Sequence, residues 1–250
     1  MAILFGLLCI VIPVSATTWY VNDDGGSDYT SIVDAVNDGW QTDLTVKAGD
    51  TICVLPGTYE RFVVGRSINF QALNDKGPVI IDGASQDNAG IWVGGQSGDD
   101  ASGTVFDGFT LNNCKDGISF GAYAPNSIVR NCIFNGMSFG IRFESSQNCT
   151  FENNIISSGT TSRMIYVRYG SCNIINNTIT NVSSEYGHIY FRDTTGNCSV
   201  LNNTFTNVIV PSNYGLIYPR GTKGGTITVA GNTFDSTFEG GIPSTSVTTI

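Results

Sequence analysis

The sequence is poor in charged residues and nearly devoid of histidine. Only 13% of its 250 residues are charged, and His188 is the one histidine. Twelve basic residues against 21 acidic ones give a net charge of −9, so the chain lacks the basic footprint typical of nucleic-acid-binding proteins. We therefore expect no nucleic-acid partner. The low charge and the 30 glycines also argue against a helical protein.

A long apolar segment is missing as well. The apolar run at residues 2–14 is too short to span a membrane comfortably. It ends in Val14-Ser15-Ala16, which is typical of a secretory cleavage site, although no Lys or Arg precedes it. We predict a signal peptide over residues 1–16 and no membrane span in the mature chain. The alternative is a buried N-terminal strand.

What the sequence does contain is a repeat. CNIINNTITN (172–181) and CSVLNNTFTN (198–207) share six of ten letters and lie 26 residues apart. Related segments occur at 105–111, 128–134, 150–156 and 228–234. A second phrase keeps the same interval and alternates apolar with other residues, as half-buried strands do. Its copies are at 117–120, 140–143, 164–167, 188–191 and 216–219.

A repeat interval of 22 to 29 residues with short strands predicts a parallel β-helix. Leucine-rich repeats share this interval, but they need a leucine framework that is absent here. Residues 29–40 read as an amphipathic helix with Ile32, Val33 and Val36 on one side, capped by Thr30 or Ser31. Such a helix would cover the open end of the β-helix and hide its backbone edge from water.

The stretch SIVDAVND…AGDTICVLPGTYERFVVGRSINF, followed by NNTI and NNTF coils, resembles the proteins of the pectate-lyase-like superfamily. It is similar to archaeal cell-surface β-helix repeat proteins and to relatives of the periplasmic copper-binding protein of nitrous-oxide reductase maturation. The resemblance covers nearly all of residues 17–238. It implies an all-β fold, a single-stranded right-handed parallel β-helix of about eight coils with an N-terminal capping helix. It says little about function, because this scaffold hosts enzymes, adhesins and envelope proteins.

One predicted sheet face carries files of aromatic and charged residues. The outward positions of the second phrase hold Ser119, Arg142, Tyr166, Tyr190 and Tyr218, then Gly121, Glu144, Arg168, Arg192 and Arg220. One explanation is structural, because Arg planes can lie on Tyr rings, with Glu144 and Asp193 compensating part of the charge. The other is glycan binding, with tyrosine faces for sugar rings and guanidinium groups for uronate or sulfate. Trp92 is a weaker glycan-binding candidate.

Catalysis on this face has few candidates. Lyases of the superfamily generally combine a calcium-binding acidic cluster with a basic residue, and its hydrolases use clustered aspartates. If the chain is a lyase, Arg168 or Arg192 would be the base, and Glu144 or Asp193 would hold calcium. His188 is expected to be an outward surface residue in a variable column. We lean towards a protein that is not an enzyme and predict neither a resident metal nor another cofactor.

Two kinds of column are expected inside the coils. Cys149, Cys172 and Cys198 each precede an apolar anchor by two residues, so they should stack inward as free thiols. A disulfide is an alternative, and soft-metal binding is suggested only by the copper-binding relatives. Two asparagine columns are stacked, and either of them could point inward. They are Asn131, Asn153, Asn176 and Asn202, and beside them Asn154, Asn177, Asn203 and Asn232.

These features predict an exported protein, secreted or at the cell surface, with a non-enzymatic envelope or adhesin role and a polysaccharide or cell-surface glycan as partner. The alternative is a polysaccharide lyase or glycoside hydrolase acting on uronate-containing polymers, and metal delivery rests on the resemblance alone. Glycosylation sequons at Asn148, Asn181 and Asn197 fall at expected exposed positions. Residues 239–250 read as a linker-like tail, which leaves room for a further domain or subunit at that end.

Overall fold

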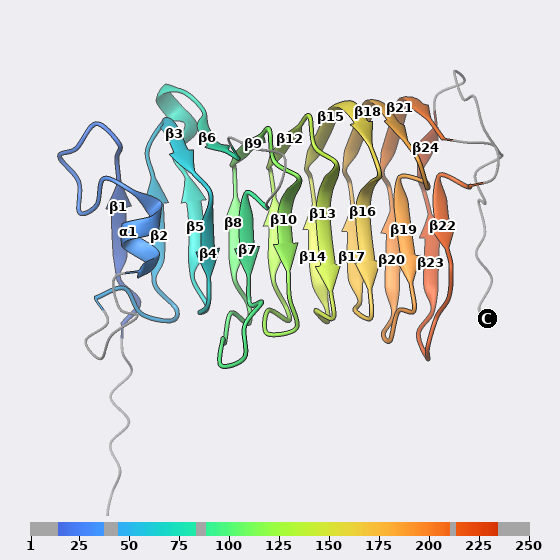
Figure 1. The fold of residues 1–250 in the computed structure, drawn as a ribbon, viewed down its shortest axis with the longest axis horizontal. Helices are drawn as coiled ribbons and strands as arrows, with labels where there is room; N and C mark the ends of the chain where they lie inside the picture. Colours follow the sequence, from blue (N-terminus) through green and yellow to red (C-terminus); the bar gives the residue numbers. More distant parts are fainter. Residues whose placement is uncertain (1–14, 38–44, 84–88, 211–213, 235–250) are drawn as a thin grey trace, which may run out of the picture.

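The computed structural model describes residues 15–37, 45–83, 89–210 and 214–234 (Figure 1). Over these residues the chain winds into a right-handed parallel β-helix, which confirms the predicted fold. Nearly all of the predicted signal peptide lies outside the described residues, as do the end of the predicted helix (38–40) and the tail at 239–250. The outer limits predicted for the β-helix domain, 17–238, therefore stay a prediction.

The strands form three parallel sheets, and successive coils add neighbouring strands to each sheet. Sheet 1 contains β1 (Thr18–Val21), β2 (Thr51–Val54), β5 (Asn69–Ala72), β8 (Val105–Asp107), β11 (Ile128–Arg130), β14 (Cys149–Glu152), β17 (Cys172–Ile175), β20 (Cys198–Leu201) and β23 (Ile227–Ala230). Sheet 2 contains β3 (Gly57–Glu60), β6 (Val79–Asp82), β9 (Thr110–Asn112), β12 (Ile133–Asn135), β15 (Ile155–Thr161), β18 (Thr178–Ser184), β21 (Thr204–Ile209) and β24 (Thr233–Phe234). Sheet 3 contains β4 (Phe62–Val64), β7 (Ile91–Val93), β10 (Asp116–Phe120), β13 (Phe139–Glu144), β16 (Arg163–Arg168), β19 (Ile189–Arg192) and β22 (Ile217–Pro219).

The two repeated phrases correspond to fixed parts of each coil. Each copy of the first phrase spans a strand of sheet 1, a tight turn and a strand of sheet 2, and each copy of the second phrase supplies a strand of sheet 3. Equivalent residues are Cα partners, as Phe106, Val129 and Phe151 are in sheet 1. The repeat therefore arises because each inward position meets the same position of the next coil, about 4.8 Å away.

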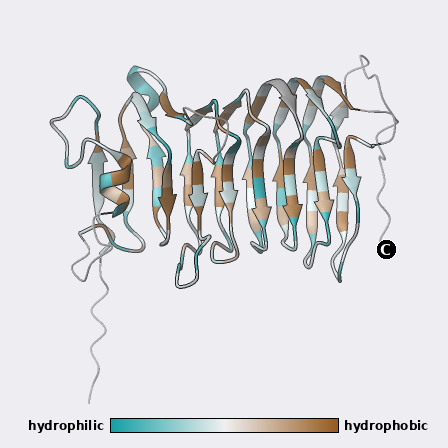
Figure 2. Ribbon diagram, viewed as in Figure 1, coloured by the Kyte–Doolittle hydropathy of each residue, from teal (hydrophilic) through white to brown (hydrophobic). Residues whose placement is uncertain are grey.

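The core is a continuous column of apolar side chains along the axis. Figure 2 shows apolar residues recurring on the strands of successive coils. Aromatic rings stack within this column: the Phe70 and Phe106 rings lie 5.0 Å apart and the Phe120 and Phe143 rings 5.2 Å apart, both nearly parallel. Each ring faces its counterpart in a neighbouring strand, so the register that buries the rings also stacks them on one another.

The predicted capping helix is α1 (Ile32–Asn37), which packs against β3 and β4. Ser31 is its N-terminal cap, since the Ser31 hydroxyl accepts a hydrogen bond from the backbone N–H of Asp34 (3.3 Å). Ile32 and Val36 are buried and Val33 is half-buried, as the amphipathic pattern predicted. A short 3₁₀ turn, η1 (Asn74–Lys76), lies between β5 and β6.

Asp50 ties the start of the chain to the first coils. Its buried carboxylate accepts hydrogen bonds from the backbone N–H groups of Thr17 (2.8 Å) and Lys47 (2.9 Å) and from the indole of Trp19 (2.9 Å). Burial raises the pKa of this carboxyl group, but the donors outweigh burial and hold the pKa of Asp50 below its ordinary value.

The inward asparagine column forms a hydrogen-bonded ladder of Asn154, Asn177, Asn203 and Asn232. The backbone N–H of Asn154 donates to Asn177 Oδ1 (2.9 Å), and that of Asn177 donates to Asn203 Oδ1 (2.9 Å). Each amide also donates to a main-chain oxygen of the preceding coil, as Asn177 Nδ2 does to the Phe151 carbonyl (2.9 Å). The ladder therefore satisfies the backbone at the turn between sheets 1 and 2, where no strand pairing does so.

The other asparagine column has a different role from the inward ladder. Asn131, Asn153, Asn176 and Asn202 are exposed, and each has φ of 55°. Asparagine tolerates this left-handed conformation better than most residues, which is why it recurs at the turn. The sequence pattern suggested that this column could be a hydrogen-bonded ladder, but the inward column forms the ladder, and these four exposed residues act through backbone geometry.

Replacing Asn177 with alanine should lower the free energy of unfolding by about 3 kcal/mol or more. The change leaves the Asn154 N–H, the Phe151 carbonyl and Asn203 Oδ1 without this partner in a buried site. Denaturant unfolding followed by circular dichroism measures the effect. Asn176→Gly is the control, because glycine adopts the left-handed turn and should change stability by less than about 1 kcal/mol. Equal losses in the two variants would contradict the ladder's role.

Candidate functional site

The tyrosine file of sheet 3 is present, but most of it is covered. Tyr166 is 7% exposed and Tyr190 is 3% exposed, so neither offers the open ring face that the sequence suggested. The reason is Arg163, a residue outside the predicted files. Its guanidinium carbon lies 4.5 Å from the ring centre of Tyr190 and 5.1 Å from that of Tyr166. Tyr218, the last tyrosine, remains partly exposed.

The predicted catalytic residues are engaged with one another. Arg168 Nη1 lies 2.6 Å from Glu144 Oε1. Its hydrogen bond to the Tyr169 hydroxyl, with Glu144 nearby, raises the pKa of Arg168 above its ordinary value, the opposite of what a general base needs. Arg192 Nε lies 3.7 Å from Asp193 Oδ2.

Arg220 donates to the Tyr190 hydroxyl (3.3 Å), and this hydrogen bond raises the Arg220 pKa. Among the described residues, no three His, Cys, Asp or Glu side chains form a group that could hold a metal ion.

Trp92 is the aromatic side chain of sheet 3 that is open to solvent, with 43% of its surface exposed. It projects outward from β7, where its Cα partners are Val63 of β4 and Ser119 of β10. The indole lies across the backbone of Gly95, so closely that a Cβ on that residue would overlap three ring atoms. The indole therefore packs against the backbone of Gly95, which leaves room for it because glycine has no side chain.

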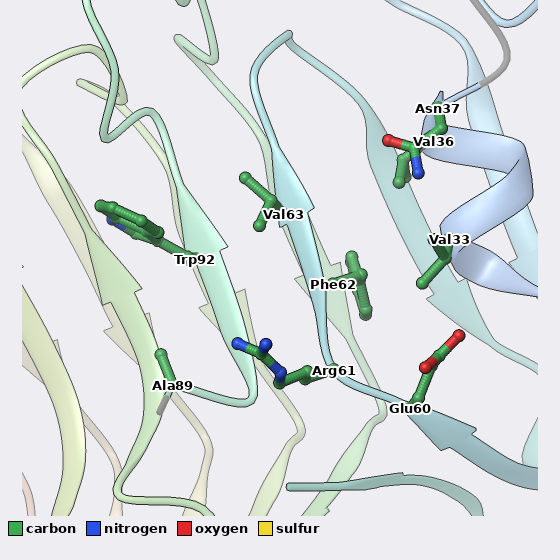
Figure 3. Close-up of a pocket in the computed structure, with 9 residues that line it drawn as sticks. All are labelled: Val33, Val36, Asn37, Glu60, Arg61, Phe62, Val63, Ala89 and Trp92. Carbon is green, nitrogen blue, oxygen red and sulfur yellow. The ribbon is translucent and has the colours of Figure 1, made fainter. Parts of the chain in front are cut away.

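A first pocket of about 270 Å³ lies between Trp92 and helix α1 (Figure 3). Val33 and Val36 of α1 form one wall, Trp92 forms the other, and Val63 lies between them. Polar groups come from Asn37, Glu60 and Arg61. Within the described residues, the guanidinium of Arg61 has no ion pair.

A second pocket of about 370 Å³ lies on the other side of Trp92 and is lined by Ser119, Gly121, Arg142 and Glu144 among others. Arg142 Nε lies 3.3 Å from Asp116 Oδ2, and its guanidinium carbon lies 4.6 Å from the Phe139 ring centre. Burial raises the pKa of Asp116, an effect that Arg142 partly offsets. The two pockets share Trp92, so one exposed ring separates two polar hollows on the same face.

His188 is fully buried, contrary to the expectation that it lies outward. At the corner where the chain enters sheet 3, two successive residues face the core, as His188 and Ile189 do, and both backbone N–H groups donate to the Leu216 carbonyl (3.0 Å each). Strict alternation fails there, which explains the wrong assignment. Burial lowers the pKa of His188 to about 4, an effect that a hydrogen bond with the Ile209 backbone partly offsets.

The cysteine column lies inside the β-helix, as predicted. Cys149 and Cys172 are Cα partners, and the six described cysteines are buried and free. Burial raises the pKa of Cys149 to about 12, that of Cys198 to about 11 and that of Cys172 well above its ordinary value. The sequon residues Asn148, Asn181 and Asn197 are exposed, and their glycosylation stays a prediction.

The fold places the chain among the right-handed parallel β-helix proteins, with a tryptophan and arginine face on one sheet. The family model of the periplasmic copper-binding protein (NosD) matches residues 47–248, and the chain belongs to that family. This confirms the resemblance noted from the sequence. Among the described residues, no helix is both long and apolar enough to cross a membrane.

Solved structures with a related shape include the alginate lyase from Paenibacillus sp. str. FPU-7, with 13% identity, a TM-score of 0.41 and coverage of 90% of this chain and 97% of the lyase. The carrot pectin methylesterase has 12% identity, a TM-score of 0.32 and coverage of 91% and 89%. None of the curated proteins matches the sequence.

The family is named for copper binding, so a copper site would need suitable donor side chains in this chain. Copper favours thiolate, thioether and imidazole ligands. Five of the six described cysteines pack in the core, and burial raises the pKa of all six thiols. His188 is buried, and Met137 and Met164 pack in the core. Since no three donors come together within the described ranges, these residues do not fit a copper site.

The buried imidazole should make stability depend on pH. Unfolding returns His188 to an ordinary pKa near 6.5, so the unfolded chain takes up a proton at a higher pH than the folded chain does. The free energy of unfolding should therefore fall by about 2 kcal/mol between pH 7 and pH 5. Denaturant titrations across this range, repeated with His188→Leu, measure it. An equally steep fall in the variant would assign the effect to other groups.

The cysteine column should be unreactive while the protein is folded. In a Cys9→Ser variant, we expect Cys149, Cys172 and Cys198 to be labelled by a thiol reagent only as fast as the chain unfolds, because the core is closed and these thiols stay protonated. Labelling followed by mass spectrometry in native buffer and in denaturant measures this. Rapid native labelling of Cys172 would contradict the closed core.

Proposed function

We propose that this chain is an exported, non-enzymatic β-helix protein of the cell envelope that binds glycans on the outward face of sheet 3. Its family is that of a periplasmic protein, which supports export. The observation that carries the binding role is the exposed indole of Trp92, which rests on Gly95 between two polar pockets.

The chemistry of this face suits a sugar ring. An indole offers a flat apolar surface that can cover the apolar side of a pyranose, and its edge can remain hydrated. Glu60, Arg61 and Asn37 on one side, with Glu144 and Arg142 on the other, supply donors and acceptors for hydroxyl groups. Binding sites of this kind combine an apolar surface with a few placed polar groups.

The arginines favour a glycan that carries some negative charge. Arg61 and Arg163 form no ion pair within the described ranges, so their guanidinium groups can donate hydrogen bonds to a carboxylate or sulfate. The protein as a whole carries a net charge of −9, which repels a polyanion at a distance. We therefore expect binding to depend on contacts at this face rather than on long-range attraction.

Lyase or hydrolase activity is the competing proposal. The likeness of the fold to pectate-lyase-like proteins keeps it open, and Arg168, Arg192, Glu144 and Asp193 remain its candidates. The contacts of Arg168 favour binding over catalysis. Its hydrogen bond to Tyr169 and its ion pair with Glu144 keep the proposed base protonated, and the ion pair occupies the Glu144 carboxylate.

Trp92→Ala should weaken retention on immobilised uronate-containing glycans by about tenfold, which corresponds to about 1.4 kcal/mol of lost stacking. Gly95→Ala should weaken it as well, because the added Cβ displaces the indole. Tyr20→Ala is the matched control, since Tyr20 is 45% exposed but lies on sheet 1. Retention that is unchanged in Trp92→Ala would contradict the site.

Incubation of the protein with soluble uronate-containing polymers, with and without calcium, tests catalysis. Polymer that is shortened by the wild-type protein and left intact by Arg168→Ala would establish the enzyme and replace the non-enzymatic proposal.

A further inference from the structure

We infer that the first pocket receives the end of a glycan chain, so that the protein recognises chain termini rather than internal segments. This inference rests on the proposed function, because it concerns the same face of sheet 3. Three observations support it: the helix that closes the face, the size of the pocket and the polar groups within it.

Helix α1 closes the face at one end. Sheet 3 begins with β4, and the side of the first pocket away from Trp92 is formed by Val33, Val36 and Asn37 of α1. Figure 1 shows α1 at the N-terminal end of the stacked coils, and Figure 3 shows it facing Trp92 across Val63. A glycan that lies along the axis over Ser119 and Trp92 therefore meets a wall once it has passed the indole.

The wall is held firmly in place. Ile32 and Val36 of α1 are buried in the core, and Ser31 caps the helix. Moving the helix aside to admit a continuous chain would expose this apolar surface to water, at a cost of about 25 cal/mol for each Å². On the opposite side of Trp92 the face continues through β10, β13, β16, β19 and β22. The arrangement is therefore blocked at one end and open at the other.

The pocket has room for about one sugar ring. Its volume of about 270 Å³ lies near the lower end of small-molecule sites, which run from about 300 to 1,000 Å³. A ring stacked on Trp92 would fill most of it. A second ring beyond the first would have to occupy the space taken by α1.

The polar groups suit a terminal residue. A chain end differs from an internal unit by a free hydroxyl group, which can both donate and accept hydrogen bonds. Figure 3 shows the Glu60 carboxylate on the α1 side of the pocket and the Arg61 guanidinium on the Trp92 side. Glu60 can accept from a hydroxyl group, and Arg61, which has no ion pair within the described residues, can bind the carboxylate of a terminal uronate.

Binding of oligogalacturonates of defined length and of high-mass polygalacturonate, measured by calorimetry on the full chain, tests the inference. We expect about one protein bound per glycan chain at every length, because each chain has one matching end. Blocking that end chemically should weaken binding by about tenfold or more. Glu60→Ala should bind native and end-blocked oligomers alike, because Glu60 is the group proposed to accept from the free hydroxyl. Arg220→Ala, an arginine beyond β22 at the far end of the sheet, should keep the preference.

The outcomes separate the two proposals. If the number of proteins bound per polymer rises with its length and Trp92→Ala removes that binding, the glycan site stands and chain-end recognition is overturned. If wild-type protein binds neither these uronates nor neutral and sulfated glycans presented in the same way, the proposed function fails and takes this inference with it.

Discussion

Everything in this molecule depends on in-register stacking of equivalent residues from coil to coil. The asparagine ladder shows the constraint most directly, because the amides of Asn154, Asn177 and Asn203 each bond to the main chain of the coil before and to the amide of the coil after. A shift of one residue in any strand would turn its apolar side chains to solvent. Satisfied polar groups at the turns and stacked rings in the core therefore specify the same register.

This constraint explains where the chain can vary and where it cannot. Inward positions are limited to side chains that match their neighbours above and below, such as the phenylalanine stacks of sheets 1 and 3. Outward positions have no such limit. The face of sheet 3 can therefore carry arginine, tyrosine and tryptophan side chains that the fold does not need, and chemistry of this protein is expected there.

The fold was predictable from the sequence because register leaves a visible repeat. Both phrases were located correctly, and Ile32, Val36 and the cap of α1 followed from local rules.

The site was less predictable, because side chains on one face cover one another. Arg163 shields Tyr166 and Tyr190, yet it lies one position outside the alternating pattern. His188 was misplaced because alternation breaks at the corner before sheet 3. Trp92 was visible as a candidate, but its backing by Gly95 and the wall formed by α1 arise only from the folded coils.

The position of α1 at one end of the stack has a consequence for how such a protein can change over evolutionary time. A duplicated coil inserted beyond β10 would add one strand to each sheet and lengthen the open part of the sheet 3 face by about 4.8 Å. The pocket between α1 and Trp92 would be untouched, since no residue that forms it comes from those later coils. The length of the sheet 3 face depends on the number of coils, whereas the pocket at its closed end depends on α1 and the first few strands. Mutation can therefore change one without changing the other.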